Sequence, residues 1–107
     1  MNSGIESNNQ QLKKNQVVLL DKARISLDTL QNKNKEEVIR AIHSLEEFPN
    51  FSTIQIHQLK SIPNYFIGRA GIYRIIFDFK PGEITIIDII NHDRLEILYS
   101  SLKESEK

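Results

Sequence analysis

The side chains that could do chemistry are concentrated in the C-terminal half of the chain. Between residues 57 and 80 the sequence holds four cations and one acid, a local excess of three positive charges. The cations are Lys60, Arg69, Arg74 and Lys80, and the acid is Asp78. Grouped arginine and lysine side chains bind anions such as phosphate through charge-assisted hydrogen bonds. This segment therefore indicates a small basic site.

Histidine is the side chain that exchanges protons most readily near neutral pH. The chain has three histidines, and His92 lies where the last expected strand meets the last expected helix. We interpret His92 as the candidate acid or base, and His43 and His57 as surface residues. No two histidines have metal-ligand spacing, and the absence of cysteine excludes thiolate metal sites and thiol nucleophiles. We expect neither a metal nor another cofactor.

Each candidate also has a purely structural interpretation. Arg74 could pair with Asp78 or Glu83, and Arg69 could form a structural salt bridge. Lys60 could be a solvated turn lysine, and His92 could bridge the strand–helix junction. The sequence leaves these alternatives open.

Composition sets limits on the class of protein. With 14 basic and 14 acidic residues the formal net charge is zero, whereas general nucleic-acid-binding proteins carry a broad basic surface. A chain of 107 residues suits one domain. No apolar run approaches the roughly 20 residues that cross a bilayer, and residues 1–16 lack the hydrophobic core of a signal peptide. We expect a cytoplasmic protein with no membrane partner.

The N-terminal half is expected to supply one strand and two helices. Residues 1–16 are interpreted as a polar flexible extension, and residues 17–107 as a single domain. Residues 17–20 form a short β-prone run that could be a first strand, with an early helical turn as the alternative. Apolar spacing predicts a helix over residues 21–31. Asn34 is expected to cap a second helix.

The C-terminal half is expected to be a sheet followed by a helix. Strands are predicted at residues 65–69, 72–79 and 84–90, and Lys80–Glu83 has the composition of a hairpin turn. Strict alternation in the second strand places Arg74 on the face opposite its aromatic side chains. The β-branched third strand is expected to be buried on both faces. Residues 93–103 are predicted to form the last helix.

Several segments in this half resemble a known family when taken together and in order. They are Leu59-Lys60-Ser61, Arg69-Ala-Gly71-Ile-Tyr73-Arg74, the strand Ile84–Ile90, and Asn91-His92 followed by Tyr99. Over residues 17–103 the chain resembles the RelE/ParE superfamily of bacterial type II toxin–antitoxin toxins. The resemblance implies an α+β fold: a strand, a two-helix hairpin, a three-stranded antiparallel sheet and a C-terminal helix.

The resemblance also implies an activity and partners. RelE-like members cut messenger RNA on the ribosome, and ParE-like members inhibit DNA gyrase without a catalytic site; both are held inactive by a cognate antitoxin in a hetero-oligomer. For a RelE-like nuclease the family pattern assigns catalysis to Arg74, Arg69 and His92. It assigns RNA binding to Lys60, Arg94 and Tyr99, and for Tyr99 packing in the core is the alternative.

The sequence departs from the most active nucleases of this family at two places. Ile67 and Gly68 stand in the strand where those proteins carry lysines, and Asp93 stands where many relatives have arginine. Metal-independent mRNA cleavage on the ribosome is the leading hypothesis. The alternatives are a ParE-like gyrase inhibitor, which the His92-Asp93-Arg94 ending resembles, and a non-toxic relative that binds an antitoxin.

Overall fold

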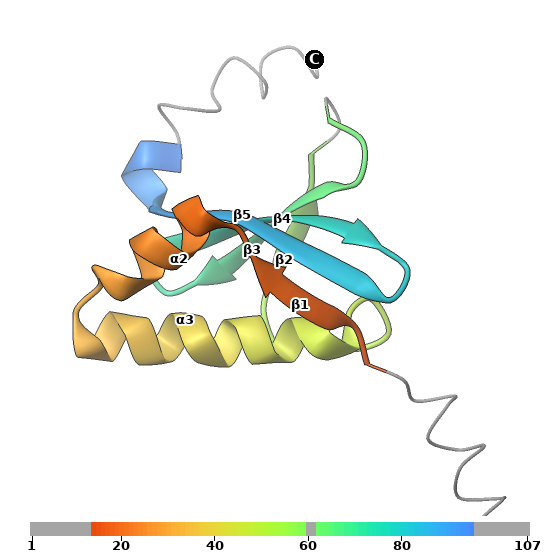
Figure 1. Ribbon diagram of the computed structural model, residues 1–107, viewed down its shortest axis with the longest axis horizontal. Coiled ribbons are helices and arrows are strands. Elements are labelled where there is room, and N and C mark those ends of the chain that lie inside the picture. The colour runs from red at the N-terminus through yellow and green to blue at the C-terminus, as the bar shows by residue number, and fades with distance from the viewer. Residues whose placement is uncertain (1–13, 60–61, 96–107) are drawn as a thin grey trace, which may run out of the picture.

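A mixed β-sheet forms the centre of the computed structural model, which describes residues 14–59 and 62–95 (Figure 1). Within these residues the sheet has five strands in the order β1-β5-β4-β3-β2. The strands are β1 (Gln16–Leu19), β2 (Ile56–Gln58), β3 (Tyr65–Ala70), β4 (Tyr73–Lys80) and β5 (Glu83–Asn91). β1 runs parallel to β5, and every other neighbouring pair is antiparallel.

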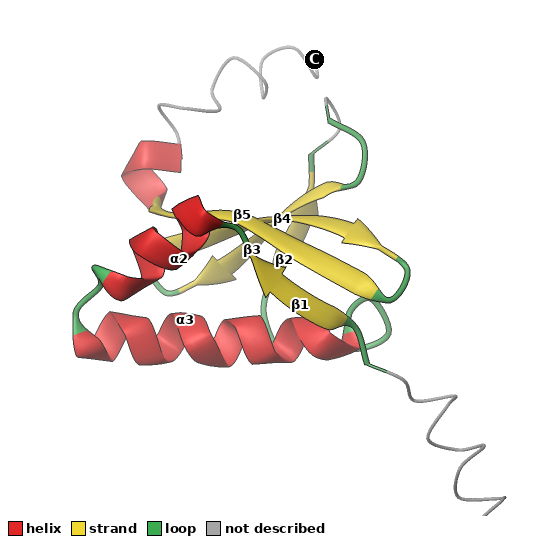
Figure 2. Ribbon diagram, in the orientation of Figure 1, coloured by secondary structure: helices red, strands yellow, loops and turns green. Residues whose placement is uncertain are grey.

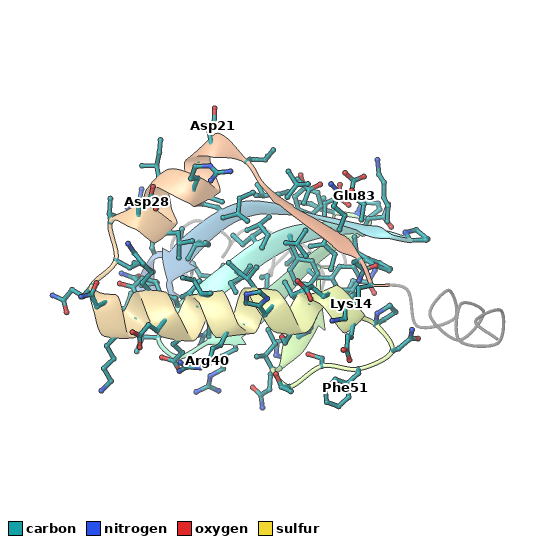
Figure 3. The ribbon with its side chains drawn as sticks, turned by 60° about the horizontal axis from the view of Figure 1, so that its bottom comes forward. Lys14, Asp21, Asp28, Arg40, Phe51 and Glu83 are labelled. Atoms are coloured by element: carbon teal, nitrogen blue, oxygen red, sulfur yellow. The ribbon has the colours of Figure 1, made fainter. Side chains whose placement is uncertain are left out.

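The helices α2 (Asp21–Asp28) and α3 (Asn32–Ser44) lie on one side of this sheet (Figure 2). A short 3-10 turn, η1 (Leu45–Glu47), continues α3. Charged side chains such as Asp21 and Asp28 at the two ends of α2 point away from the sheet (Figure 3). The polar faces of both helices are thus left to solvent, as expected for amphipathic helices that cover a sheet.

The main core lies between the helices and the sheet face that they cover. Its members are nearly inaccessible to solvent: Ala23, Val38, Ala41, Leu45, Ala70, Ile75, Phe77, Ile84, Ile86 and Ile89. Tyr73 and Phe79 pack against this cluster as well, so the predicted alternation of β4 is confirmed. Full burial of a side chain as large as Phe77 contributes roughly 1.5–3 kcal/mol.

Phenylalanine rings close one end of this core. Phe48, which follows η1, makes edge-to-face contacts with Phe66, Phe77 and Phe79 at centroid distances of 5.1–5.6 Å. Phe66 also stacks on Phe77 at 5.5 Å. These contacts tie the chain after α3 to both β3 and β4, and so fix the position of the two strands that carry the candidate arginines.

The expected α+β fold is confirmed, with one additional strand. The sequence analysis counted three antiparallel strands, whereas the structure adds β2 at the edge of the sheet, paired with β3. The expected cap of the second helix was wrong. Asn34 lies inside α3, which begins at Asn32 after an extended Gln31 that makes no side-chain cap hydrogen bond.

β5 was expected to be buried on both faces, but part of it is only half-buried because the strand contains a bulge. The register shifts between Ile76 and Phe77, because Ile76 pairs with Asp88 while Phe77 pairs with Ile86. Ile87 is therefore an extra residue in β5 and is only half-buried. Asp88 is 4% exposed and anchors this bulge to α2. Its Oδ1 accepts hydrogen bonds from the Ile89 amide (2.8 Å) and the Ser26 hydroxyl (3.2 Å).

Candidate functional site

Arg69 and Arg74 stand directly opposite each other on β3 and β4. Their neighbours Ala70 and Tyr73 face the main core, so alternation turns both arginines toward the other face of the sheet. Directly opposed residues have side chains that start about 4.5–5.5 Å apart. The structure therefore brings together the two arginines that the sequence analysis selected.

Contacts with the β3–β4 turn hold Arg74 in place. Its Nη1 donates to the carbonyl oxygens of Gly71 and Tyr73, each at 2.9 Å. Arg69 is exposed, and its Nη1 lies 3.4 Å from Oε1 of Gln55, the residue before β2. Backbone carbonyls thus orient the Arg74 side chain, whereas the Arg69 side chain has one long contact with the Gln55 amide group.

The turn between the two arginines requires glycine. Gly71 adopts a φ of +63°, a left-handed conformation that other residues enter at a steric cost. A Cβ at this position would lie 2.8 Å from Cδ of Glu37 in α3. The Glu37 carboxylate is the flexible end of a long side chain and can move away, so the left-handed turn is what requires glycine here.

Two like charges on directly opposed strand positions repel each other. In the described part of the chain the ion pairs are Lys14–Glu46, Lys22–Asp88 and His43–Glu46. The structural interpretation that Arg74 pairs with Asp78 or Glu83 is therefore not what the structure shows. Asp78 instead has a buried Oδ1 without a hydrogen-bond partner among the described residues. Two arginines on directly opposed positions concentrate positive charge on this face of the sheet, and such a patch is suited to an anion.

His92 begins the helical turn that follows β5. Its amide donates to the carbonyl oxygen of Ile72 in the β3–β4 turn (2.8 Å), and its side chain is exposed. Asn91 caps this turn, because its Oδ1 accepts the Arg94 amide at 2.8 Å. The helix thus begins one residue before the predicted Asp93, and His92 and Arg94 lie at the end of the sheet where the arginine pair is found.

The other predicted contacts cannot be placed. Lys60 and Tyr99, assigned to RNA binding by the family resemblance, lie outside the described residues. Within the described residues no group of three or more potential metal ligands occurs.

The arginine face also carries His57, which the sequence indicated as a surface residue. His57 on β2 is exposed and stands opposite Ile67, two residues from Arg69 on the same strand. Residues two apart on a strand share a face, so His57 lies on the arginine face. The strand β2 was not predicted, because a strand of three residues is too short to show alternation. Without β2 the sequence does not indicate the face on which His57 lies.

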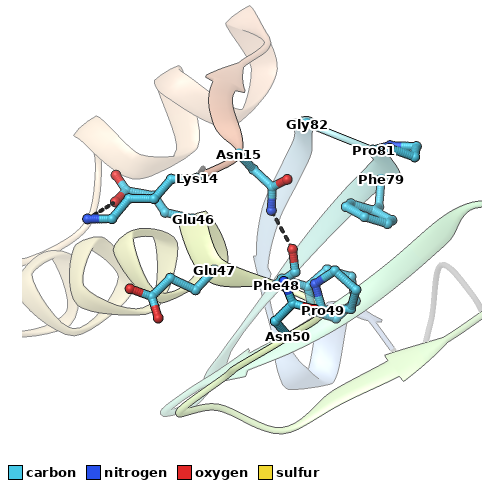
Figure 4. Close-up of a pocket in the computed structure, with 10 residues that line it drawn as sticks. All are labelled: Lys14, Asn15, Glu46, Glu47, Phe48, Pro49, Asn50, Phe79, Pro81 and Gly82. Atoms are coloured by element: carbon cyan, nitrogen blue, oxygen red, sulfur yellow. Dashed lines mark hydrogen bonds and ion pairs between the residues drawn. The ribbon is translucent and has the colours of Figure 1, made fainter. Parts of the chain in front are cut away.

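A hollow of about 620 Å³ lies at a different place, between the start of β1, the segment after α3 and the β4–β5 turn (Figure 4). Phe48, Pro49, Phe79 and Pro81 line its apolar part. None of the predicted site residues that the structure describes borders it. The candidate site is therefore a sheet surface and not this hollow.

None of the described helices is long and apolar enough to cross a membrane. No protein-family profile matches the chain, and no curated protein matches it in sequence. Solved structures, however, match its fold.

The chain is similar to a RelE toxin in a RelB–RelE antitoxin–toxin complex from Methanococcus jannaschii, with a TM-score of 0.62 and 15% identity over 77% of this chain and 98% of that one. A RelE–RelB complex from Pyrococcus horikoshii gives a TM-score of 0.62 with 19% identity, over 75% of this chain and 97% of its counterpart. The isolated Escherichia coli RelE toxin gives a TM-score of 0.60 with 14% identity, over 82% of this chain and 95% of that toxin. The TM-scores and the shares of the chains covered establish a shared RelE-like fold.

Proposed function

We propose that this chain of RelE-like fold is the toxin of a toxin–antitoxin pair, and that it blocks translation by cutting messenger RNA on the ribosome without a metal ion. The observation that carries the proposal is the Arg69–Arg74 pair. The two arginines occupy directly opposed positions on the sheet face that the helices do not cover. The fold that the chain shares with RelE toxins supports the same assignment.

The chemistry that these residues would perform is phosphodiester transfer within RNA. The 2′-oxygen attacks the adjacent phosphorus, and negative charge builds on the non-bridging oxygens in the transition state. Arg69 and Arg74 would offset that charge, since preorganised cations stabilise a transition state most where its charge develops. His92, at the same end of the sheet, would serve as acid or base.

A cognate antitoxin is the proposed protein partner. Two of the similar structures are complexes of a RelE toxin with a RelB antitoxin. By this analogy the chain would form a hetero-oligomer with an antitoxin. Co-expression with the product of the neighbouring gene, followed by co-purification, tests this partner directly.

The decisive experiment adds the purified protein to a translating extract and maps the ends of the mRNA. Wild type is expected to generate new 5′ ends within ribosome-bound messages. Arg74→Ala and His92→Ala are expected to lower the cleavage rate at least about 100-fold, the usual contribution of such groups. Arg40→Ala, which removes an exposed arginine on the outward side of α3, serves as the matched control (Figure 3). Undiminished cleavage in both site variants would refute the site.

A gyrase inhibitor remains the second candidate, favoured by the composition of β3. Ile67, on the arginine face, stands where a strongly cationic nuclease site would carry another positive charge. A protein with a net charge of zero also gains less electrostatic attraction to the RNA backbone than a basic protein does. Inhibition of DNA supercoiling by purified gyrase, without any mRNA cleavage, would select this function over the first.

A further inference from the structure

The positions of His57 and His92 relative to the arginine pair are set by strand register. His57 pairs with Ile67, and Ile67 pairs with Ile76, so these three lie in one row across the sheet. Arg69 and Arg74 occupy the row two residues further along their strands. His92 lies beside Ile72, two residues beyond Arg74 in the same direction.

This register places the two histidines on opposite sides of the arginine pair. Neighbouring strands are about 4.8 Å apart and residues rise about 3.3 Å along a strand. Each histidine Cα is then about 10 Å from the midpoint of the two arginines, on a diagonal that runs through that midpoint. A histidine side chain spans about half of the distance from its Cα to this midpoint. A hydrogen bond from its imidazole to an ester oxygen of a phosphate bound at the midpoint spans most of the rest.

From this placement we infer that His57 is the second acid–base group of the site and works with His92. The inference rests on the proposed RNA cleavage. In-line displacement at phosphorus needs one group beside the attacking oxygen and another beside the leaving oxygen, on opposite sides of the phosphate. A row of base, phosphate site and acid along one diagonal of the sheet meets this requirement, which His92 alone does not.

The proton balance of the step uses both rings. One imidazole takes the proton of the 2′-hydroxyl as the bond from the 2′-oxygen to phosphorus forms. The bond from phosphorus to the 5′-oxygen breaks, and that oxygen receives a proton from the other, protonated imidazole. The products are a 2′,3′-cyclic phosphate and a 5′-hydroxyl, with the non-bridging oxygens held by Arg69 and Arg74.

The surroundings of His57 leave its ring accessible to a substrate. Its side chain is exposed, and β2 is the last strand of the sheet in the described part of the chain. The titratable groups that face it from β3 are its diagonal neighbours Arg69 and Tyr65. Diagonal neighbours on paired strands have Cα atoms about 7–8 Å apart, close enough for an arginine-bound phosphate to reach the imidazole.

The test compares His57→Ala with His43→Ala in single-turnover mRNA cleavage on ribosomes across a range of pH. His43 is an exposed histidine on α3 that contacts Glu46 and lies away from the arginine face. His57→Ala is expected to cut about 100-fold more slowly, to lose one limb of the pH–rate profile, and to regain rate when free imidazole is added. His43→Ala is expected to behave as wild type. His57→Gln, which retains the size of the side chain, shows the same loss if the ring acts chemically.

Each outcome separates this inference from the proposed function. If wild type cuts and Arg74→Ala does not, while His57→Ala cuts within threefold of wild type with both limbs intact, the role of His57 is refuted and the proposed function stands. If wild type does not cut mRNA at all, both are refuted. A slow His57→Ala that imidazole does not rescue, and that His57→Gln restores, would show a structural role and would also overturn the inference.

Discussion

Replacing Arg69 with glutamine is expected to stabilise the fold while it impairs the site. Arg69 and Arg74 are directly opposed on neighbouring strands, and like charges in this position destabilise a sheet by roughly 0.2–1 kcal/mol. Coulomb's law gives about 0.7 kcal/mol for two unit charges about 6 Å apart in water. Among the described residues, the side-chain contact that Arg69→Gln gives up is the long 3.4 Å contact with Gln55. The free energy of unfolding should therefore rise by about 0.5 kcal/mol at low ionic strength.

Salt dependence identifies the cause of this gain. The Debye length falls from about 30 Å at 0.01 M salt to about 3 Å at 1 M, so the repulsion between the guanidinium groups is screened in concentrated salt. Urea denaturation at the two salt concentrations should show the gain at 0.01 M and almost none at 1 M. Arg69→Lys keeps the charge and should show no gain at either concentration.

A matched control is available on α2. Arg24 is exposed and has Asp21 and Asp28 at helical spacing, so Arg24→Gln should lower stability slightly in low salt. The reasoning is refuted if Arg69→Gln is less stable than wild type at 0.01 M salt, or if its gain is the same at both concentrations. Either result would mean that the two guanidinium groups do not repel each other in the folded protein.

Two further predictions concern the backbone that positions the site. Gly71→Ala should lower the free energy of unfolding by about 1–3 kcal/mol, because alanine would have to adopt the left-handed φ of +63°. The carboxylate end of Glu37 can move away from the added Cβ, so the double variant with Glu37→Ala should recover little of this loss in urea denaturation. Full recovery in the double variant would argue against backbone strain. Asn91→Ala should lower the free energy of unfolding by about 1 kcal/mol, because it removes the cap of the turn that carries His92. Asn91→Asp should retain the cap. Equal thermal unfolding midpoints for the two variants would contradict the capping role.

Much of the sheet was predictable because the signals are local. The alternation of residues 72–79 predicted which side of β4 faces the core, and the Lys80–Glu83 turn was found as expected, with Gly82 at a φ of +86°. Each signal depends on residues that are close in sequence. Alternation reports which face of a strand is buried, and turn composition reports where the chain reverses.

Other features could not be predicted because they depend on residues that are distant in sequence. β2 exists because three residues pair with β3, and β1 is held by parallel pairing with β5, some 67 positions away in the register Gln16–Glu83. In the sequence Asp88 interrupts an apolar strand. In the structure it is buried at a bulge, where it accepts a hydrogen bond from Ser26 and forms an ion pair with Lys22, both in α2. Only the assembled sheet and helix supply those partners.

The candidate site divides in the same way. The sequence by itself selected Arg69, Arg74 and His92, since residue type, the glycine between the arginines and strand alternation are all local properties. The tertiary structure alone decided that the two arginines are directly opposed and that His57 joins them on one face, because register between strands is set by the pairing of whole elements and not by any one of them. It also placed two positive charges on neighbouring strands, and this concentration of charge is the physical basis for the proposed anion site.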